Sequence, residues 1–102
     1  MQEMTMEPAL RGTVEKIIDI NLDDESLRGK CQIFQYYQTQ GIIFSVESAV
    51  FGAVWTNVIT TFVDMKARTN QEISDSEMEE FRRIFASRAI EIKSKIKELA
   101  NF

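Results

Sequence analysis

The chain has 102 residues and a mass of 11.8 kDa, the size of one domain with a single hydrophobic core. Twelve basic and sixteen acidic side chains give a net charge of −4, which opposes binding to a phosphate backbone. Histidine is absent and there is one cysteine, which excludes His-dependent triads, Cys-rich zinc sites and an internal disulfide. Four glycines and one proline are too few for the turns of a β-sandwich or barrel, so the composition favours helices.

Apolar residues at helical spacing predict two helices in the first part of the chain, over about residues 8–20 and 23–40. Pro8 suits a first helical turn, where its missing N–H is not needed, and Gly41 is typical of a helix stop. The apolar faces consist of Leu10, Val14, Ile17 and Ile18 in the first helix and of Leu27, Cys31 and Phe34 in the second. Cys31 is therefore expected to be a small core residue rather than a nucleophile.

The third predicted helix, over about residues 42–68, holds the longest apolar stretch of the chain. Between Gly41 and Val63 the only charged side chain is Glu47. The second half has one polar ridge, formed by Asn57, Thr61, Asp64 and Arg68. The first half is apolar around its circumference, which requires burial on every side. Glu47 could face a pocket as a functional carboxylate, but pairing with a lysine of the next helix is the favoured interpretation.

The fourth predicted helix extends over about residues 74–100 without interruption. Ser74 and Glu77 have the spacing of a capping box, in which each side chain accepts a hydrogen bond from the other residue's backbone N–H. The apolar stripe of this helix consists of Met78, Phe81, Phe85, Ala89, Ile92, Ile96 and Leu99. The third and fourth helices each have about 26 residues, or about 39 Å, and their short connection predicts a long antiparallel hairpin in a four-helix bundle.

The apolar segment of the third helix allows three interpretations. Its length is sufficient to cross a bilayer, but Glu47, Asn57 and several hydroxyl side chains oppose insertion, since a charge in a spanning helix costs about 2.5–3.5 kcal/mol. Phe44, Phe51 and Trp55 could line a ligand cavity, although aromatic residues at helical spacing are more often plain core. The favoured interpretation is the buried axis of a helical bundle, and membrane association is disfavoured.

Carboxylates are the remaining candidates for chemistry. Glu77 and Glu80 lie at the start of the fourth helix, and Asp64 lies across the short connection from them. Together they could coordinate Mg²⁺ in a small enzyme or ligand-binding protein, because oxygen ligands suit that ion. An acidic first turn favoured by the helix dipole explains the same residues without a metal, and we therefore expect no cofactor.

Four helices from one chain of this length would leave apolar faces uncovered. The first half of the third helix has more apolar surface than three partners can cover, and the second helix has extra apolar residues outside its core face. A two-fold interface allows one patch to cover itself, so the sequence predicts a homodimer or higher oligomer. The predicted interface includes residues 42–55, among them Ile43, Val46, Val50 and Val54, together with Ile33 and Tyr36.

The sequence thus predicts one all-α domain over residues 1–102, with bundle-like packing completed by dimerisation. Surplus apolar faces and missing catalytic side chains favour a non-enzymatic oligomerisation or protein-interaction module. The alternative is a small all-α ligand-binding protein or Mg-dependent enzyme, and a weaker one is a membrane-associated subunit. A single cysteine and an N-terminal MQEMTMEPALRG without the features of an export signal favour the cytoplasm, and no basic stripe with stacking aromatics indicates a nucleic-acid partner.

Overall fold

A computed structural model describes residues 8–100, and this part of the chain consists of five helices without a strand. The helices are α1 (Pro8–Asn21), α2 (Asp24–Thr39), α3 (Val46–Arg68), α4 (Asp75–Ser87) and α5 (Ala89–Ala100). The all-α prediction is confirmed. Thr5 and Glu7 precede Pro8 in the sequence and are candidate caps of the first helix; these two residues and most of the segment used to argue against an export signal lie outside the described residues.

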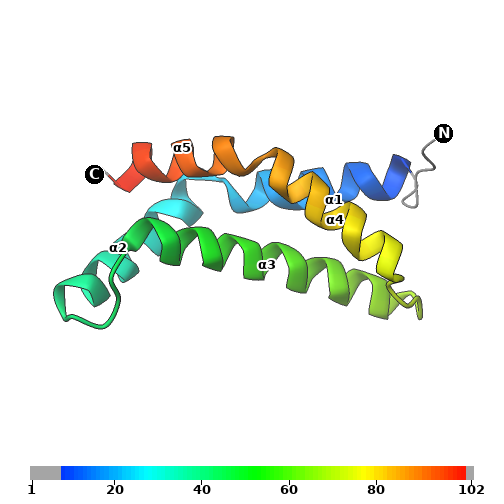
Figure 1. The fold of residues 1–102 in the computed structure, drawn as a ribbon, viewed down its shortest axis with the longest axis horizontal. Helices are drawn as coiled ribbons and strands as arrows, with labels where there is room; N and C mark the ends of the chain where they lie inside the picture. The colour runs from blue at the N-terminus through cyan, green and yellow to red at the C-terminus, as the bar shows by residue number, and fades with distance from the viewer. Residues whose placement is uncertain (1–7, 101–102) are drawn as a thin grey trace.

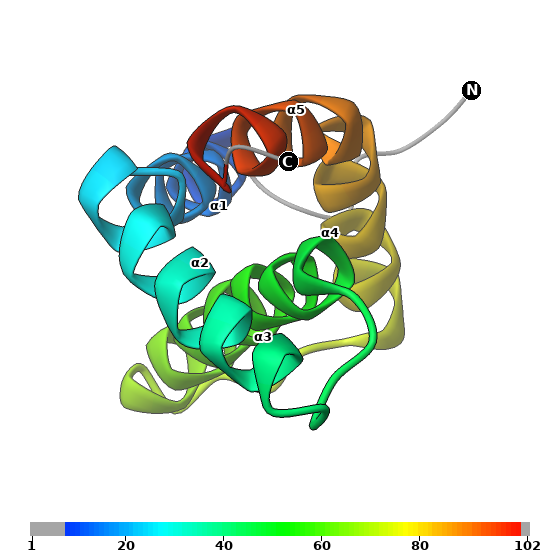
Figure 2. The same ribbon diagram turned by 90° about the vertical axis from the view of Figure 1, so that its left-hand side faces the viewer.

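The long helix α3 extends along one side of the molecule, and α1, α4 and α5 lie along the other side (Figure 1). Figure 2 looks onto the end where α2 leads into α3 and shows the helices surrounding a common interior. That interior is filled by one cluster of buried apolar side chains to which all five helices contribute. The helices therefore share a single hydrophobic core.

Glycine ends α2 as the sequence predicts. Gly41 has a φ of 75°, in the left-handed region that glycine adopts without steric cost. The Ile42 N–H donates to the Tyr37 carbonyl at 2.9 Å, and the Gly41 N–H donates to the Gln38 carbonyl at 3.0 Å. This pair of bonds is a Schellman motif, which satisfies carbonyls that the end of a helix leaves open.

The predicted start of the third helix near residue 42 is wrong, because α3 begins at Val46. After the Gly41 cap the chain crosses residues 42–45 as a loop. Ser45 is then the N-cap of α3, and its side chain accepts from the Ser48 N–H at 3.2 Å. Two local caps, one closing α2 and one opening α3, thus separate the helices over a stretch whose hydrophobicity alone favours a continuous helix.

The connection from α3 to α4 is also defined by two local caps, one at the end of α3 and one at the start of α4. Asn70 has a φ of 55°, and the Gln71 N–H donates to the Lys66 carbonyl at 2.9 Å, so a second Schellman motif ends α3. At the start of α4 the capping box is confirmed: the Ser74 side chain accepts from the Glu77 N–H, and the Glu77 carboxylate accepts from the Ser74 N–H, both at 3.1 Å.

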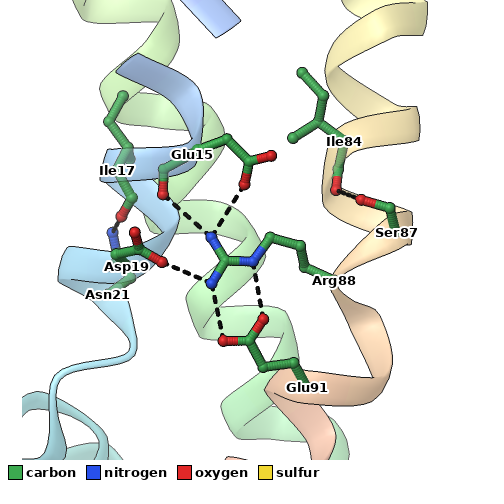
Figure 3. Close-up of polar contacts among 8 residues, drawn as sticks. All are labelled: Glu15, Ile17, Asp19, Asn21, Ile84, Ser87, Arg88 and Glu91. Carbon is green, nitrogen blue, oxygen red and sulfur yellow. Dashed lines mark hydrogen bonds and ion pairs between the residues drawn. The ribbon is translucent and has the colours of Figure 1, made fainter. Parts of the chain in front are cut away.

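The prediction of one continuous helix over residues 74–100 is wrong, because the helix is interrupted at Arg88. The interruption contains neither glycine nor proline; Arg88 has φ −106° and ψ 5°. The Ser87 hydroxyl donates to the Ile84 carbonyl at 2.6 Å, a local bond that competes with regular helix geometry. The Arg88 side chain reaches across to α1, as Figure 3 shows. The bend lets α4 pack on α1 while α5 packs on α2 and α3.

The core of α3 is a stripe of residues spaced by four. Its buried residues are Val46, Val50, Val54, Val58, Phe62 and Lys66. Because a helix has 3.6 residues per turn, each step of four moves the stripe about 40° around the axis. The buried face therefore rotates along α3, which explains why Val50 is buried although Asn57, almost directly in line with it along the helix, is exposed.

Burial of the first half of α3 on every side is not observed. Ser48, Gly52 and Thr56 are exposed, and their small or hydroxyl side chains tolerate water. The opposite side is covered by other helices of the same chain. Val46, Val50 and Val54, which the sequence assigns to an interface between chains, are core residues with at most 2% of their surface exposed. A dimer interface cannot include them unless the core opens.

Aromatic side chains fill the space between α3 and α4. The Trp55 ring lies 5.5 Å from Phe81 and 4.8 Å from Phe85, measured between centroids. Phe62 stacks on Phe81 at 4.9 Å, and Phe51 meets Phe85 edge-on at 5.6 Å. Phe51 and Trp55 are thus packed against the core, as expected, whereas the same expectation for Phe44 is wrong, because Phe44 is fully exposed.

Removal of the Phe62 side chain should test this core. Phe62 is fully buried, so Phe62→Ala leaves a cavity and should lower the free energy of unfolding by about 3–5 kcal/mol. The neighbouring residue Val63 is exposed at 42%, and Val63→Ala serves as the matched control, with an expected loss of less than about 1 kcal/mol. Urea unfolding followed by circular dichroism measures both; similar losses would contradict the burial of Phe62.

Candidate interaction surface

Large apolar side chains are exposed together where α2 ends and the loop to α3 begins. Phe44 is fully exposed, and Ile42, Tyr36 and Ile33 retain 65%, 61% and 54% of their surface. Tyr37 beside them is exposed at 37%. We call these five residues the end patch. Five large exposed apolar side chains within residues 33–44 make this segment the candidate interaction site, since large exposed apolar patches on monomeric proteins mark such sites.

Helix geometry and loop hydrogen bonds bring the end patch together. Ile33, Tyr36 and Tyr37 are three and four residues apart, so they share one face of α2. The rings of Tyr36 and Tyr37 lie 6.0 Å apart, measured between centroids. The Ile42 N–H donates to the Tyr37 carbonyl at 2.9 Å, which holds the loop against the end of α2. The patch therefore combines a helix face with the loop that follows it.

A side-chain bond fixes the position of the loop further. The Gln38 amide Nε2 donates to the Phe44 carbonyl at 3.1 Å. The contact holds the Phe44 backbone against α2, and the Phe44 ring is fully exposed in this position. The exposure of Phe44 is thus a consequence of the loop conformation, which the caps at Gly41 and Ser45 define.

The end patch lies in one of the two longest uncharged segments of the chain, each of 16 residues. No side chain from Cys31 to Val46 carries a charge, whereas the whole chain has 28 charged residues, 12 basic and 16 acidic. The exposed polar residues in this segment are the amides and hydroxyl of Gln32, Gln38, Thr39 and Gln40. Exposed tyrosine and phenylalanine without charges are typical of the centre of a protein interface.

The structure divides the predicted interface into three parts. Ile33 and Tyr36 are exposed in the end patch, and Ile43 is half-buried in the loop. The three valines are buried, as described above. Sequence reasoning included Ile42 and Phe44 in the interface stretch but missed them as loop residues, because they were assigned to a helix. The signal that could have found them is Gly41 as a helix stop followed four residues later by Ser45 as an N-cap.

The carboxylates proposed for magnesium do not converge. Glu77 binds Lys66, with Oε2 and Nζ 2.9 Å apart, and Glu80 binds Arg11 at 3.2 Å. Asp64 is exposed on α3. Within residues 8–100 no group of three or more histidine, cysteine, aspartate or glutamate residues is placed to hold a metal ion. Glu77 and Glu80 thus serve ion pairs that join the helices.

The pair of Lys66 and Glu77 is largely buried between α3 and α4. The side chains retain 8% and 13% of their exposure. The hydrogen bond from Lys66 lowers the pKa of the Glu77 carboxyl, burial opposes this, and the Ser74 N–H adds to the lowering. Each charged group is the hydrogen-bonding partner of the other. The pair is therefore structural rather than a catalytic acid or base.

Glu47 is the only charged residue between Gly41 and Val63, and Cys31 is the only cysteine of the chain. Both have ordinary structural surroundings. Glu47 lines a shallow surface pocket with Ser48, Phe51 and Lys93, so it does lie near a lysine of the last helix. Lys93 Nζ is 5.9 Å from the centroid of the Phe51 ring. Cys31 is a buried core residue, and burial raises the pKa of its thiol, which keeps it protonated and unreactive.

Among the described helices, α3 has the length and mean hydropathy of a segment that could cross a membrane. A core helix of a globular protein meets the same two criteria. The buried stripe of α3 is covered by other helices and ends in the Lys66 ion pair. The helix therefore has a role within the core that explains its composition.

Comparison of the chain with protein-family models, with curated proteins and with solved structures finds no match. Function must therefore be inferred from the arrangement of the side chains. Among the described residues, the ion pairs and caps are accounted for by folding. The end patch is not, since exposed aromatic side chains add nothing to the stability of the single chain.

Acid should weaken the protein through its paired carboxylates. Asp24, Glu77 and Glu91 have lowered pKa values because they accept hydrogen bonds from Lys95, Lys66 and Arg88. A carboxyl with a lower pKa in the folded state contributes stability above its unfolded pKa of about 4, and this contribution is lost as the pH falls through the folded pKa. We expect the free energy of unfolding to decrease steadily below about pH 4.5.

Glu77→Gln tests the contribution of one pair. At pH 7 it should cost about 1.5–3 kcal/mol, since a hydrogen bond to a charged group is removed. The difference from the unchanged protein should shrink as the pH falls through the lowered pKa of Glu77, because the carboxyl then becomes protonated in both states of the unchanged protein. Glu72→Gln, in the exposed loop before α4, is the control. A cost for Glu77→Gln that is the same at pH 7 and below the pKa of Glu77 would contradict this role.

Proposed function

We propose that the protein is a non-enzymatic helical interaction module that forms a homodimer through the end patch. The observation that carries the proposal is the complete exposure of Phe44 among Ile33, Tyr36 and Ile42. Covering one such side chain is worth about 1.5–3 kcal/mol, so an association that buries several of them is favourable. Two-fold symmetry lets the same patch serve both copies.

Charge supports a second copy as the occupant. The net charge of −4 makes two copies repel each other over most of their surfaces. The uncharged segment from Cys31 to Val46 is a surface on which two copies can meet without placing carboxylates opposite each other. Burying it also removes no charge from water, which avoids the largest cost of forming an interface. The bundle-like packing expected from the sequence would then be completed at the end of α2.

The size of the end patch suggests modest affinity. Aromatic side chains bury roughly 150–250 Å² each, so three of them and two isoleucines supply several hundred Å² per copy. Stable interfaces use about 800 Å² per partner, and smaller ones are typical of transient association. We therefore expect a dimer that forms at micromolar concentrations and dissociates on dilution.

The other functions have less support. For a magnesium-dependent enzyme, Glu77 and Glu80 would have to leave Lys66 and Arg11, their partners between helices. For a membrane-associated subunit, α3 would have to leave a core in which its stripe is buried. The acidic charge opposes a nucleic-acid partner. A cytoplasmic location remains part of the proposal, supported by a single cysteine, which suits a reducing compartment.

Size-exclusion chromatography with light scattering tests the dimer. At about 100 µM the protein should have the mass of two chains, and Phe44→Ser should weaken association at least about tenfold, equivalent to 1.4 kcal/mol. The matched control is Ile90→Ser on α5, because Ile90 is exposed at 81% but lies outside the end patch. Both residues are exposed, so neither change should unfold the chain, which circular dichroism checks.

Two results would contradict the proposal. One is a monomeric mass at that concentration. The other is equal weakening by Phe44→Ser and Ile90→Ser, which would place the interface elsewhere. Tyr36→Ser is a second test of the same surface, and it should act in the same direction as Phe44→Ser because the two side chains belong to one patch.

A further inference from the structure

The backbone between α4 and α5 contains nothing that ends a helix. Residues 75–100 include neither glycine nor proline, and Arg88 alone separates the two helices. The apolar residues Phe81, Phe85, Ile92 and Ile96 are buried and recur at helical spacing on both sides of the junction. A sequence with this pattern favours a continuous helix of 26 residues. The bend therefore needs a cause outside the local sequence pattern.

Arg88 supplies that cause by binding α1 and α5 together. Its guanidinium donates to the Glu15 carbonyl at 3.2 Å and to the Glu15 carboxylate at 3.1 Å. It also contacts the Asp19 carboxylate at 2.6 Å and both carboxylate oxygens of Glu91, at 3.0 and 2.9 Å. Figure 3 shows the guanidinium surrounded by these acceptors. The side chain is only 16% exposed, so these contacts replace most of its hydration.

The hydrogen bonds also fix the charge state of this cluster. They raise the pKa of Arg88 above its already high ordinary value, with Glu91 as the largest cause, Asp19 next among the raising contacts, and burial opposing both. Arg88 therefore remains charged, and it must keep its partners as long as it stays buried. A bend held by this residue is tied to the position of α1.

We propose that the α4–α5 junction is a two-state hinge, with Arg88 as the latch that holds it bent. In the bent state α4 packs on α1 while α5 packs on α2 and α3. Without the contacts of Arg88 the junction adopts regular helical geometry, and α4 and α5 become one straight helix, as the sequence of residues 75–100 favours. The straight state carries α5 away from α2, and it breaks the contacts of Lys95 with Asp24 and of Gln35 with the Ala100 carbonyl.

The Ser87 hydroxyl has a supporting role. It donates to the Ile84 carbonyl at 2.6 Å, and such bonds from serine back to the preceding turn bend helices. The contacts of Arg88 and Ser87 are made by side chains and can be removed without changing the backbone chemistry, while the buried Ile92 and Ile96 continue to favour the bent position of α5. The hinge is independent of the end patch, since none of the residues involved belongs to it.

Pulsed electron paramagnetic resonance between two spin labels tests the hinge. Glu79→Cys on α4 and Lys97→Cys on α5 provide exposed attachment sites, and Cys31→Ala removes the native thiol. Eighteen residues of straight helix place these positions on the same face, about 27 Å apart. The chain that retains Arg88 should show a single distance between the labels, shorter than the distance of about 27 Å in the straight helix. Arg88→Met should add a population near the straight-helix distance, and adding Ser87→Ala should increase it.

Arg83→Met is the matched control, because Arg83 is an exposed arginine of α4 whose carboxylate contact is 4.0 Å long. It should leave the distance distribution unchanged. An Arg88→Met distribution identical to that of the unchanged chain would overturn the hinge. If Arg88→Met does not fold, Asp19→Asn combined with Glu91→Gln is measured instead, and an unchanged distribution there overturns it equally. A Phe44→Ser background removes dimerisation through the end patch from all these comparisons.

Discussion

The stripe of valines on α3 organises the molecule. Val46, Val50, Val54 and Val58 are fully or almost fully buried, and Phe62 continues their line. A spacing of four makes this line advance around the helix, so that it cannot face a single neighbour along its whole length. Several short helices therefore cover the stripe in place of one long partner. Helices α1, α2 and α5 pack on α3, and aromatic rings of α4 contact it near Phe62. Beta-branched side chains have few rotamers and fill these positions at little entropic cost.

Burial on one side of α3 has a consequence at its N-terminus. The caps at Gly41 and Ser45 satisfy backbone groups at the C-terminal end of α2 and the N-terminal end of α3. Because of these caps, residues 42–45 form a loop rather than a helix. Ile42 and Phe44 then cannot reach the core, although their hydrophobicity is as high as that of residues inside it. Local hydrogen bonding here outweighs the burial of two large side chains, and it creates the apolar surface from which the proposed function follows.

Sequence reasoning reached the features that depend on a few neighbouring residues. The helix end at Gly41 and the capping box of Ser74 and Glu77 are local signals, and each has the geometry that its residue type requires. The interruption at Arg88 could not be found in this way, because Arg88 and its partner Glu15 are 73 residues apart. The valines were assigned to an interface because their periodicity shows that they are buried but not what buries them. The end patch was half predicted: Ile33 and Tyr36 depend on helix periodicity, whereas Phe44 depends on the two caps acting together.

The distribution of charge separates folding from interaction. Arg11 with Glu80 joins α1 to α4, Lys66 with Glu77 joins α3 to α4, and Lys95 with Asp24 joins α5 to α2. The exposed pair of Lys95 and Asp24 contributes little to stability, whereas Lys66 and Glu80 are buried, so an arrangement of the helices that removed their partners would leave a buried charge unmatched. The segment from Cys31 to Val46 takes no part in this scheme. Within the described residues, no ion pair of this segment selects a partner for its exposed surface. Its exposed aromatic rings are stabilised by contact with any complementary uncharged surface. The proposed dimer would place this uncharged segment of each copy against the other, while the net negative charge opposes contact between other parts of the two surfaces.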